Sequence, residues 1–311
     1  MLTVVSQLPK IRETSGADRP CGCATVGMCP ESADVAVPIA KRVSIVMPVL
    51  NQVEYTRGCL DSLRPDLDAG IELIIIDNNS TDETPNYLNS LSGVNVIRNE
   101  TNRGCAGGWN QGVKVATREW IVVLNNDVVV GPGWLEAMAQ FAESSGCGVV
   151  TPAIREGPIN YAFREYAADF VIRMGSVQRI GVANGICFMV ARWVFEKVGL
   201  FDERFRIGQF EDADFFIRAR NAGIKLGTTG RAFLHHYGSV TQNAIRKKAE
   251  VASYEAENRA YFRAKWGLTK LRRLGLRTRL QFRCISWRLF EGWRFGHSLH
   301  EKWVNGKVEL F

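Results

Sequence analysis

The chain has 311 residues, of which 46% are hydrophobic and 23% charged, a composition typical of a globular protein with enough apolar side chains for a buried core. Its longest candidate for a membrane span, residues 181–191, has 11 residues. A transmembrane helix needs roughly 18 or more, so we expect none. The net charge of +7 does not indicate a nucleic-acid partner, because the chain lacks a helix-turn-helix, finger or RNA-binding aromatic signature.

The first 41 residues mix Pro, Gly, Ser and charges without periodicity, and we expect a poorly ordered extension. They lack the basic start and apolar core of a signal peptide, which favours a cytoplasmic, reducing compartment. Three thiols in this segment, Cys21, Cys23 and Cys29, could hold a metal, but a closed tetrahedral site needs four ligands, and a flexible leader is the alternative. The other five cysteines show no paired spacing, so we expect them to be reduced and structural.

A regular alternation of strands and helices is predicted from Arg42 onward. Short runs rich in β-branched residues predict strands at 43–49, 72–77, 94–98 and 120–126. Segments with helical spacing lie between them at 55–63 and 83–91. Strands that alternate with helices predict an α/β fold built on a parallel sheet with right-handed crossovers.

The alternation loosens after Gly131. The polar segment 152–166, punctuated by Gly and Pro, is expected to form a loop-rich wall of a cleft. The elements expected after it are an apolar strand at 185–191, a short helix around 193–198, a turn at 199–205, a helix at 211–223 ended by Gly223, and a last strand region at 225–237. The α/β region is therefore predicted to span residues 42–242.

Residues 243–311 are predicted to form a mostly helical region that is basic and rich in Trp and Arg. From Lys225 onward there are 18 Lys and Arg against 6 Asp and Glu, so this tail carries +12 and residues 1–224 carry −5. An acidic partner would therefore dock on the tail. An anionic membrane surface, such as the inner face of the cytoplasmic membrane, or an acidic glycan lipid suits this charge.

One segment of this tail is imperfectly amphipathic. Leu280 and Trp287 fall on one side of the expected helix, opposite an apolar face. That face carries Phe282, Ile285, Leu289 and Trp293. Both packing against the main domain and contact with a membrane surface are compatible with the pattern.

Acidic side chains and a histidine recur at the ends of the predicted elements. They end two strands, open the helix at 211–223 and end the last strand, as Asp77, Asp127, Glu211, Asp212 and His236. Because open parallel sheets bind ligands at the carboxyl ends of their strands, we expect these side chains to converge on one cleft. Such a set suits an anionic diphosphate bridged by a metal ion.

The order of the motifs resembles that of the family-two inverting glycosyltransferases with the GT-A fold, in particular their rhamnosyltransferase-like branch. The resemblance covers roughly residues 42–242, and its motifs are VSIVMPVLNQ, IIIDNNSTDET, NRGCAGGWNQG, LNNDV, GLFDERF, EDADFFIRARNAG and HHYGS. It implies a Rossmann-like mixed sheet flanked by helices, with the helical region as a C-terminal extension. It also implies transfer of a sugar from a UDP- or dTDP-sugar donor.

The resemblance implies a pocket for the donor nucleotide. It places Asp77 where it accepts a hydrogen bond from the pyrimidine ring N–H, although a turn-forming role is the alternative. In NRGCAGGWNQG, small residues near a helix start allow the backbone to approach a ligand closely. The other residues implied to contact the donor are Pro48, Val49 and Leu50 through their backbone, with Asn102, Gly104, Asn110, Asn125 and Asn126.

LNND is the counterpart of the family's Asp-x-Asp metal motif, and it implies a divalent cation, Mg²⁺ or Mn²⁺. Asn125 and Asn126 replace two acids, which leaves Asp127 as the charged ligand on this strand and predicts weak binding that the donor completes. The family's late histidine corresponds to His236, for which a buried core imidazole is the alternative. Its neighbour His235 would point to the opposite face of an extended strand.

Direct displacement with inversion needs a carboxylate on the side of the sugar opposite the leaving group. The resemblance assigns this general base to Asp212, and a charge at the start of a helix is the alternative. Glu211 lies about 100° around the same helix, so we expect it to bind acceptor hydroxyls instead.

Two other functions stay compatible with the sequence. A nucleotidyltransferase of similar topology would carry a Gly-rich phosphate loop with Arg or Lys after the first strand, where MPVLNQVEY stands instead. A non-catalytic carbohydrate-binding relative would fit the replacements at Asn125 and Asn126, whereas Asp127, Asp212 and His236 together favour an enzyme. The expected acceptor is a glycan, a lipid-linked glycan or a peptide side chain.

Overall fold

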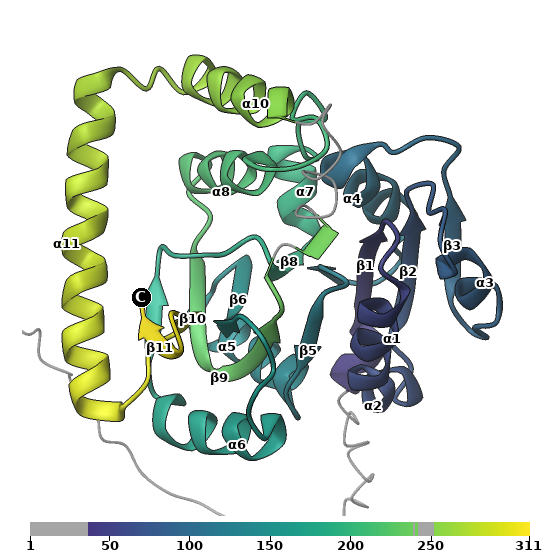
Figure 1. Ribbon diagram of the computed structural model, residues 1–311, viewed down its shortest axis with the longest axis horizontal. Coiled ribbons are helices and arrows are strands. Elements are labelled where there is room, and N and C mark those ends of the chain that lie inside the picture. Colours follow the sequence, from purple (N-terminus) through teal and green to yellow (C-terminus); the bar gives the residue numbers. More distant parts are fainter. Residues whose placement is uncertain (1–36, 239, 242–251) are drawn as a thin grey trace, which may run out of the picture. The chain divides into compact units, whose positions relative to one another are not determined.

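The structure, a computed structural model, describes residues 37–238, 240–241 and 252–311 (Figure 1). Most of the predicted N-terminal extension, including Cys21, Cys23 and Cys29, lies outside the described residues. The five cysteines within them are all unpaired, as the sequence predicts. None of the described helices is long and apolar enough to cross a membrane.

Eleven strands among the described residues form a mixed sheet. They are β1 (Val43–Val49), β2 (Glu72–Asp77), β3 (Asn95–Arg98), β4 (Trp120–Leu124), β5 (Val128–Val130), β6 (Val149–Glu156), β7 (Gln178–Ile180), β8 (Cys187–Ala191), β9 (Leu226–His236), β10 (His300–Val304) and β11 (Lys307–Leu310). The main path of the sheet runs β11-β10-β6-β8-β4-β1-β2-β3, and β9 pairs with β5, β6 and β7.

Helices cover the sheet and connect its strands (Figure 1). Within the described residues they are the 3₁₀ helix η1 (Ile39–Arg42) and the α-helices α1 (Val53–Ser62), α2 (Arg64–Asp68), α3 (Thr84–Asn89), α4 (Gly104–Val115), α5 (Trp134–Ser145), α6 (Phe163–Met174), α7 (Arg192–Val198), α8 (Glu211–Asn221), α10 (Ala252–Lys265) and α11 (Lys270–Phe295).

The first half of the sheet is parallel, as the alternation of strands and helices predicts. β1 pairs in parallel with both β2 and β4, and β2 with β3. Every residue of β4 is buried, which is typical of a parallel strand covered on both faces. β8 then joins β4 in antiparallel orientation, so the sheet is mixed.

The glycines of α4 allow this helix to pack closely against β1. A Cβ atom at Gly112 would lie 2.2 Å from Val46 Cγ1, and one at Gly108 would lie 3.1 Å from Pro48 Cβ. Because both partners belong to β1, α4 needs small residues on this face to pack against the strand. Gly108 and Gly112 therefore have a structural reason that does not depend on a ligand.

The prediction of a loop-rich wall at 152–166 is wrong over most of its length. β6 continues to Glu156 and α6 begins at Phe163. β6 is a central strand that pairs with β8, β9 and β10, so even its polar residues are covered. The guanidinium of Arg155 illustrates this, because it stacks 3.8 Å from the ring centre of Tyr161 and 4.5 Å from that of Tyr166.

The C-terminal region contains two strands that the sequence analysis missed. α10 and α11 confirm the helical prediction, but a hairpin of β10 and β11 follows them, and β10 pairs in parallel with β6. The hairpin turns at Asn305 and Gly306, both with positive φ (49° and 82°). The hairpin thus extends the sheet, and Val37–Phe311 form one compact unit.

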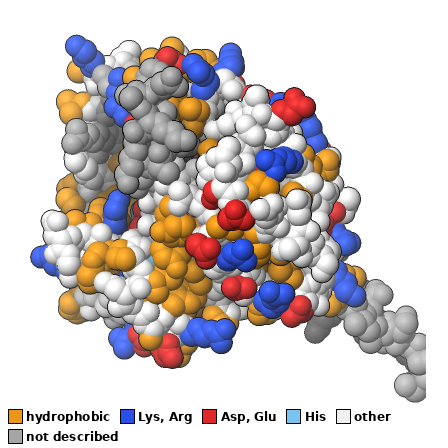
Figure 2. All heavy atoms as spheres, turned by 45° about the vertical axis from the view of Figure 1, so that its right-hand side comes forward, with side chains coloured by type: hydrophobic (Ala, Val, Ile, Leu, Met, Phe, Trp, Pro, Cys, Tyr) orange, Lys and Arg blue, Asp and Glu red, His pale blue; other side chains and the backbone are white. Residues whose placement is uncertain are grey.

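Charge is distributed unevenly over this unit. On the face shown in Figure 2, basic and acidic side chains are interspersed among apolar and neutral ones. The sequence of α11, in contrast, contains eight Lys and Arg and a single acid, Glu291. The basic excess of the tail is therefore concentrated on this helix.

Candidate active site

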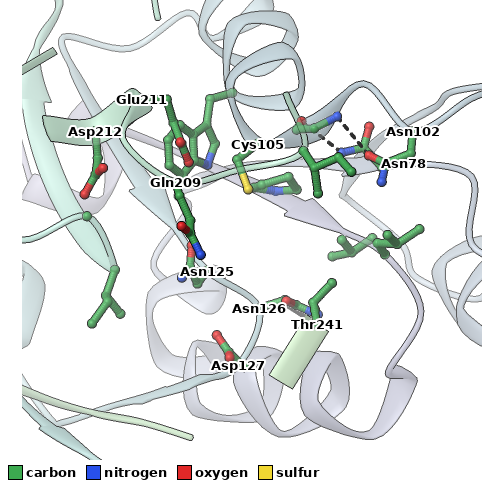
Figure 3. A pocket seen from close by; sticks show the side chains of 18 of the residues that line it. Asn78, Asn102, Cys105, Asn125, Asn126, Asp127, Gln209, Glu211, Asp212 and Thr241 are labelled. Atoms are coloured by element: carbon green, nitrogen blue, oxygen red, sulfur yellow. Dashed lines mark hydrogen bonds between the residues drawn. The ribbon is translucent and has the colours of Figure 1, made fainter. Parts of the chain in front are cut away.

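A cavity of about 290 Å³ opens where β1 and β4 end and α8 begins. Eleven of the thirteen predicted site residues line it, namely Pro48, Val49, Leu50, Asn102, Gly104, Asn125, Asn126, Asp127, Glu211, Asp212 and His236. Figure 3 shows Glu211 and Asp212 on one side of the cavity and Asp127 on another. Side chains that are far apart in sequence thus meet in one place.

Asp77 lies next to this cavity but does not line it. The residue ends β2 directly opposite Val49 of β1. Its Oδ1 atom accepts a hydrogen bond from the N–H of Ser80 at 2.8 Å, which is the turn-forming contact. Its Oδ2 atom is buried without a hydrogen-bond partner among the described residues, and Arg98 Nε lies 3.7 Å away. One oxygen therefore holds the turn, and the other can accept a further hydrogen bond.

Asn110 also lies outside the lining of the cavity. Its side-chain amide donates to the carbonyl of Phe201 at 2.9 Å and to Glu203 Oε1 at 2.8 Å, and its Oδ1 atom accepts from the N–H of Phe201 at 2.9 Å. These three bonds use most of the hydrogen-bonding capacity of the Asn110 side chain. Asn110 therefore ties α4 to the turn at 199–205 and supports the wall of the cavity from behind.

The turns that follow β1 and β2 are bonded to each other. Asn51 has a positive φ of 57°, and its N–H donates to Ser80 Oγ at 2.7 Å. Its side-chain oxygen accepts from the N–H of Thr81, also at 2.7 Å. These hydrogen bonds fix the backbone next to Pro48, Val49 and Leu50, which line the cavity.

Asp127 and His236 are brought together by the pairing of β5 with β9. His236 Nε2 lies 3.3 Å from Asp127 Oδ1, and both side chains are buried. Burial alone would raise the pKa of Asp127, but the adjacent imidazole outweighs it and holds that pKa below its ordinary value. Burial likewise lowers the pKa of His236, and the carboxylates of Asp127 and Glu156 raise it above its ordinary value.

The neighbouring histidine faces away from the cavity, as predicted for consecutive residues of a strand. His235 Nδ1 lies 2.8 Å from the hydroxyl of Tyr161. Burial lowers the pKa of His235 to about 4. His235 is thus a neutral core imidazole, and His236 is the one that lines the cavity.

The opposite wall carries two acids in the first turn of α8. Glu211 is buried, and burial followed by the charge of Asp212 raises its pKa to about 8. Burial also raises the pKa of Asp212 above its ordinary value. The carboxyl group of Asp212 lies so close to Gly185 that a Cβ atom there would be 1.9 Å from Oδ2. Gly185 therefore leaves the room that Asp212 needs.

A strained loop directly before α8 was not predicted as part of the site. Ile207, Gln209 and Phe210 all have positive φ, between 61° and 80°. For a β-branched residue such as Ile207 this conformation is a genuine outlier, and such strain clusters at functional sites. The loop holds the start of α4 through a bond from Cys105 N–H to the Ile207 carbonyl at 2.8 Å.

Other lining residues were also missed by the sequence analysis. They are Asn78, Cys105, Trp109, Gly185, Ile186, Ile207, Gln209 and Thr241. Asn78 follows Asp77 and Cys105 follows Gly104 in the sequence, so their positions in the motifs could have indicated that they line the cavity. Ile207 and Gln209 carry no chemical signature in the sequence, because their place in the site depends on an unusual backbone conformation.

The chemistry of Asp127 and His236 fits a divalent cation. Both ring nitrogens of His236 are buried without a hydrogen-bond partner among the described residues. An imidazole nitrogen with a carboxylate 3.3 Å away is a suitable pair of ligands for a metal such as Mn²⁺. Within the described residues, no group of three or more His, Cys, Asp or Glu side chains is arranged to hold a metal. A cation bound here would need further ligands from water or substrate.

The mixed α/β sheet thus brings acids and a histidine from the ends of its elements into one cavity. A match to Glycosyl transferase family 2 spans residues 44–216, more than half of the chain. The chain therefore belongs to glycosyl transferase family 2.

Several known proteins are similar to this chain. An uncharacterized protein of Mycobacterium tuberculosis is 28% identical over 205 residues, which cover 64% of this chain and 75% of that protein. The low-salt glycan biosynthesis hexosyltransferase Agl10 of Haloferax volcanii is 27% identical over 196 residues, or 58% of this chain and 63% of that protein. The crystal structure of GalNAc-T7 with UDP, GalNAc and Mn²⁺ aligns at 17% identity and a TM-score of 0.49, covering 62% of this chain and 42% of that one.

Proposed function

We propose that this protein is an inverting glycosyltransferase that moves a sugar from a UDP- or dTDP-sugar to an acceptor nucleophile. The observation that supports this most strongly is the arrangement of one cavity, in which Asp212 and Glu211 lie on one side and Asp127 on another (Figure 3), with His236 next to Asp127. A donor sugar between the two walls would have its leaving group at Asp127 and His236. Its opposite side would face Asp212.

The donor nucleotide would lie against the ends of β1 and β2. Pro48, Val49 and Leu50 line the cavity there, and the unpartnered Oδ2 atom of Asp77 is adjacent to Val49 through the strand pairing. A buried acceptor without a partner costs about 1–3 kcal/mol, so a ring N–H that reached Asp77 would be bound favourably. This hydrogen bond would favour a pyrimidine nucleotide.

Asp127 and His236 would hold a divalent cation, Mg²⁺ or Mn²⁺, at the diphosphate. When bound, such a cation neutralises the negative charge that gathers on the leaving nucleoside diphosphate. Asn125 and Asn126 line the cavity beside Asp127 and would orient the diphosphate through neutral amides. Asn126 is itself fixed by a bond from its Nδ2 atom to Thr56 Oγ1 at 2.9 Å.

Asp212 would act as the general base that takes the proton from the acceptor hydroxyl. The raised pKa of Glu211, about 8, keeps that carboxyl protonated near neutral pH. Asp212 then carries the negative charge of the pair. A protonated Glu211 can donate a hydrogen bond to the acceptor, which matches the role expected from the sequence.

The proposal extends to the branch, the acceptor and the location of the protein. We infer a rhamnosyltransferase-like donor preference from the motif order, and a glycan, a lipid-linked glycan or a peptide side chain as acceptor. The basic helix α11 would bring the protein to an anionic membrane surface on the cytoplasmic side. An exposed apolar face of α11 supports that contact.

Donor turnover measured with and without Mg²⁺ or Mn²⁺ tests the proposal. Asp212→Asn should lower kcat by at least about 100-fold, the usual contribution of a general base. Asp127→Asn should cause a similar loss and raise the metal concentration needed for half-maximal rate. Asp61→Asn is a matched control, because Asp61 is exposed on α1 and should be neutral.

Three outcomes are distinguishable in this assay. Release of nucleoside diphosphate with formation of an inverted glycoside supports the proposal. Formation of a nucleoside triphosphate and a sugar 1-phosphate from the donor when pyrophosphate is added would indicate a nucleotidyltransferase instead. Binding of the nucleotide sugar without turnover would identify a carbohydrate-binding relative and contradict the proposal, as would a near-normal rate in Asp212→Asn.

A further inference from the structure

A second cavity of about 290 Å³ lies between α8, α11 and the segment 181–184. Phe216, Leu280 and Trp287 give it an apolar wall, and three arginines supply its charge. The cavity is separate from the first one and contains none of the predicted site residues.

Only one of the three arginines is neutralised by a neighbouring acid. Arg179 forms a buried ion pair with Glu291, with Nη2 2.7 Å from Oε2. Arg220 and Arg283 have no carboxylate within ion-pair distance among the described residues. Arg220 makes only a long bond of 3.5 Å to the carbonyl of Gly181, and Arg283 stacks 4.6 Å from the ring centre of Trp287.

The two unpaired arginines lie close enough to repel each other. Burial and then the charge of Arg283 hold the pKa of Arg220 below its ordinary value. Two guanidinium groups that share a cavity without an acid form a surplus of positive charge. A bound anion would relieve the repulsion, and a phosphate offers the planar, bidentate contacts that Arg side chains favour.

The second cavity adjoins the catalytic side of the first. Gly185 lines the first cavity and its neighbour Asn184 lines the second. α8 borders both, with Asp212 in its first turn and Arg220 eight residues later. Eight residues of helix rise about 12 Å, so an acceptor with its hydroxyl at Asp212 could reach Arg220 with a group roughly that far away.

We propose that the second cavity binds a phosphate or diphosphate group of the acceptor, with Arg220 and Arg283 as its ligands. The acceptor role rests on the proposed glycosyl transfer, whereas binding of phosphate does not. Such an acceptor would present its hydroxyl to Asp212 while its anionic group is held by the two arginines. The apolar wall at Leu280 and Trp287 would contact a hydrocarbon chain attached to the phosphate.

Calorimetric titration with inorganic phosphate tests the site directly. EDTA is included so that a metal-dependent contact in the first cavity makes no contribution. The wild type should show saturable binding, and Arg220→Gln/Arg283→Gln should weaken it at least tenfold. Arg288→Gln/Arg294→Gln is the matched control, because it removes the same two charges from exposed positions of α11 that do not line the cavity.

The source of the phosphate is resolved by two further probes, farnesyl diphosphate and glucose 1-phosphate. Tighter binding of the first identifies a lipid-linked acceptor and tighter binding of the second a soluble one, and either must depend on the arginine pair. Equal binding of every probe by the wild type and the double variant would overturn the proposal. The titrations need no turnover, so a failure of glycosyl transfer leaves their result readable.

If transfer is observed, the double variant should raise the KM for a phosphate-bearing acceptor at least tenfold. The KM for the donor should change less than twofold. A rise in both constants together, or in neither, would contradict an acceptor site.

Discussion

At the scale of single residues, Glu211 shows two opposing effects on one carboxyl group. It stands at the start of α8, where the helix dipole favours a negative charge, typically by 0.3–1 kcal/mol. Burial and the neighbouring Asp212 act in the other direction and raise its pKa to about 8. Because each pKa unit corresponds to about 1.4 kcal/mol, burial is the larger effect. The carboxyl group of Glu211 therefore stays protonated near neutral pH, next to that of Asp212.

This raised pKa predicts a pH-dependent stability. The folded protein keeps a proton on Glu211 up to about pH 8, whereas the unfolded chain releases it near its ordinary value of about 4.3. The free energy of unfolding should therefore fall as the pH rises from about 5 to 8, by at most about 1.4 kcal/mol per pH unit. Glu211→Gln should remove this slope in urea unfolding measured across that range.

Asp212 is present in both proteins, so its own titration does not account for the difference. Glu136→Gln is the control, because Glu136 occupies the first turn of α5 but is exposed. It should keep the slope of the wild type. Parallel stability curves for the wild type and Glu211→Gln would show that the pKa of Glu211 is not raised.

At the scale of elements, a helix or strand can be predicted from the sequence when nearby residues determine it, and not when distant residues do. β1 and β2 have the predicted bounds, because each is built around a local run of apolar residues. The polar residues, Gly and Pro of 152–166 predict a loop, but residues 152–156 belong to β6. A central strand can cover such polar residues, as the rings of Tyr161 and Tyr166 cover Arg155. The hairpin at Asn305 and Gly306 carries a local signal, because Asn-Gly strongly favours a type I′ turn, but the long basic stretch before it favours a helix.

The candidate site likewise contains residues that the sequence predicts and residues that only the tertiary structure reveals. It was possible to predict that Asp127 and Asp212 line the cavity, because the sequence shows both their acidic side chains and their places at the end of a strand and the start of a helix. The sequence predicts a donor contact for Asn110 as well, yet its side-chain amide forms hydrogen bonds with the backbone of Phe201. Only the tertiary structure decides whether such a polar side chain faces the cavity or bonds to the backbone. It also determines the positive φ of Ile207.

α11 has an exposed apolar stripe along its length. Its members recur at intervals of three, four or eight residues and are all more than half exposed, as Leu271, Leu274, Phe282, Ile285, Leu289 and Trp293. The opposite side, with Trp287 and Glu291, faces the sheet. The predicted apolar face is thus present but points away from the main domain. Basic residues on the same helix favour an anionic lipid surface over a second copy, which they would repel.

The stripe predicts binding to vesicles that contain anionic lipid. Burying a large apolar side chain is worth about 1.5–3 kcal/mol, so Leu289→Gln/Trp293→Gln should weaken partitioning at least tenfold in a co-sedimentation assay. Ile172→Gln is a matched control, because Ile172 is 82% exposed but belongs to α6. Equal sedimentation of all three proteins would exclude the membrane contact.

At the scale of the whole described unit, one buried ion pair joins three distant segments. Arg179 of β7 binds both carboxylate oxygens of Glu291 on α11, at 3.0 Å and 2.7 Å. The same guanidinium donates to Ser298 Oγ at 2.8 Å and to the carbonyl of Phe311 at 3.0 Å. The chain end, the long helix and the sheet edge are therefore held by a single side chain, which also forms part of the second cavity.

Removing one partner of this pair should destabilise the whole unit. Glu291→Gln leaves the guanidinium of Arg179 buried at 6% exposure without its counter-charge, and a broken buried pair typically costs about 3–5 kcal/mol. Urea unfolding should show this loss in a single transition if the hairpin, α11 and the sheet unfold together. Glu257→Gln breaks the exposed pair with Arg206 and should cost less than about 1 kcal/mol. A similar small loss in both variants would mean that the C-terminal region contributes little to the stability of the sheet.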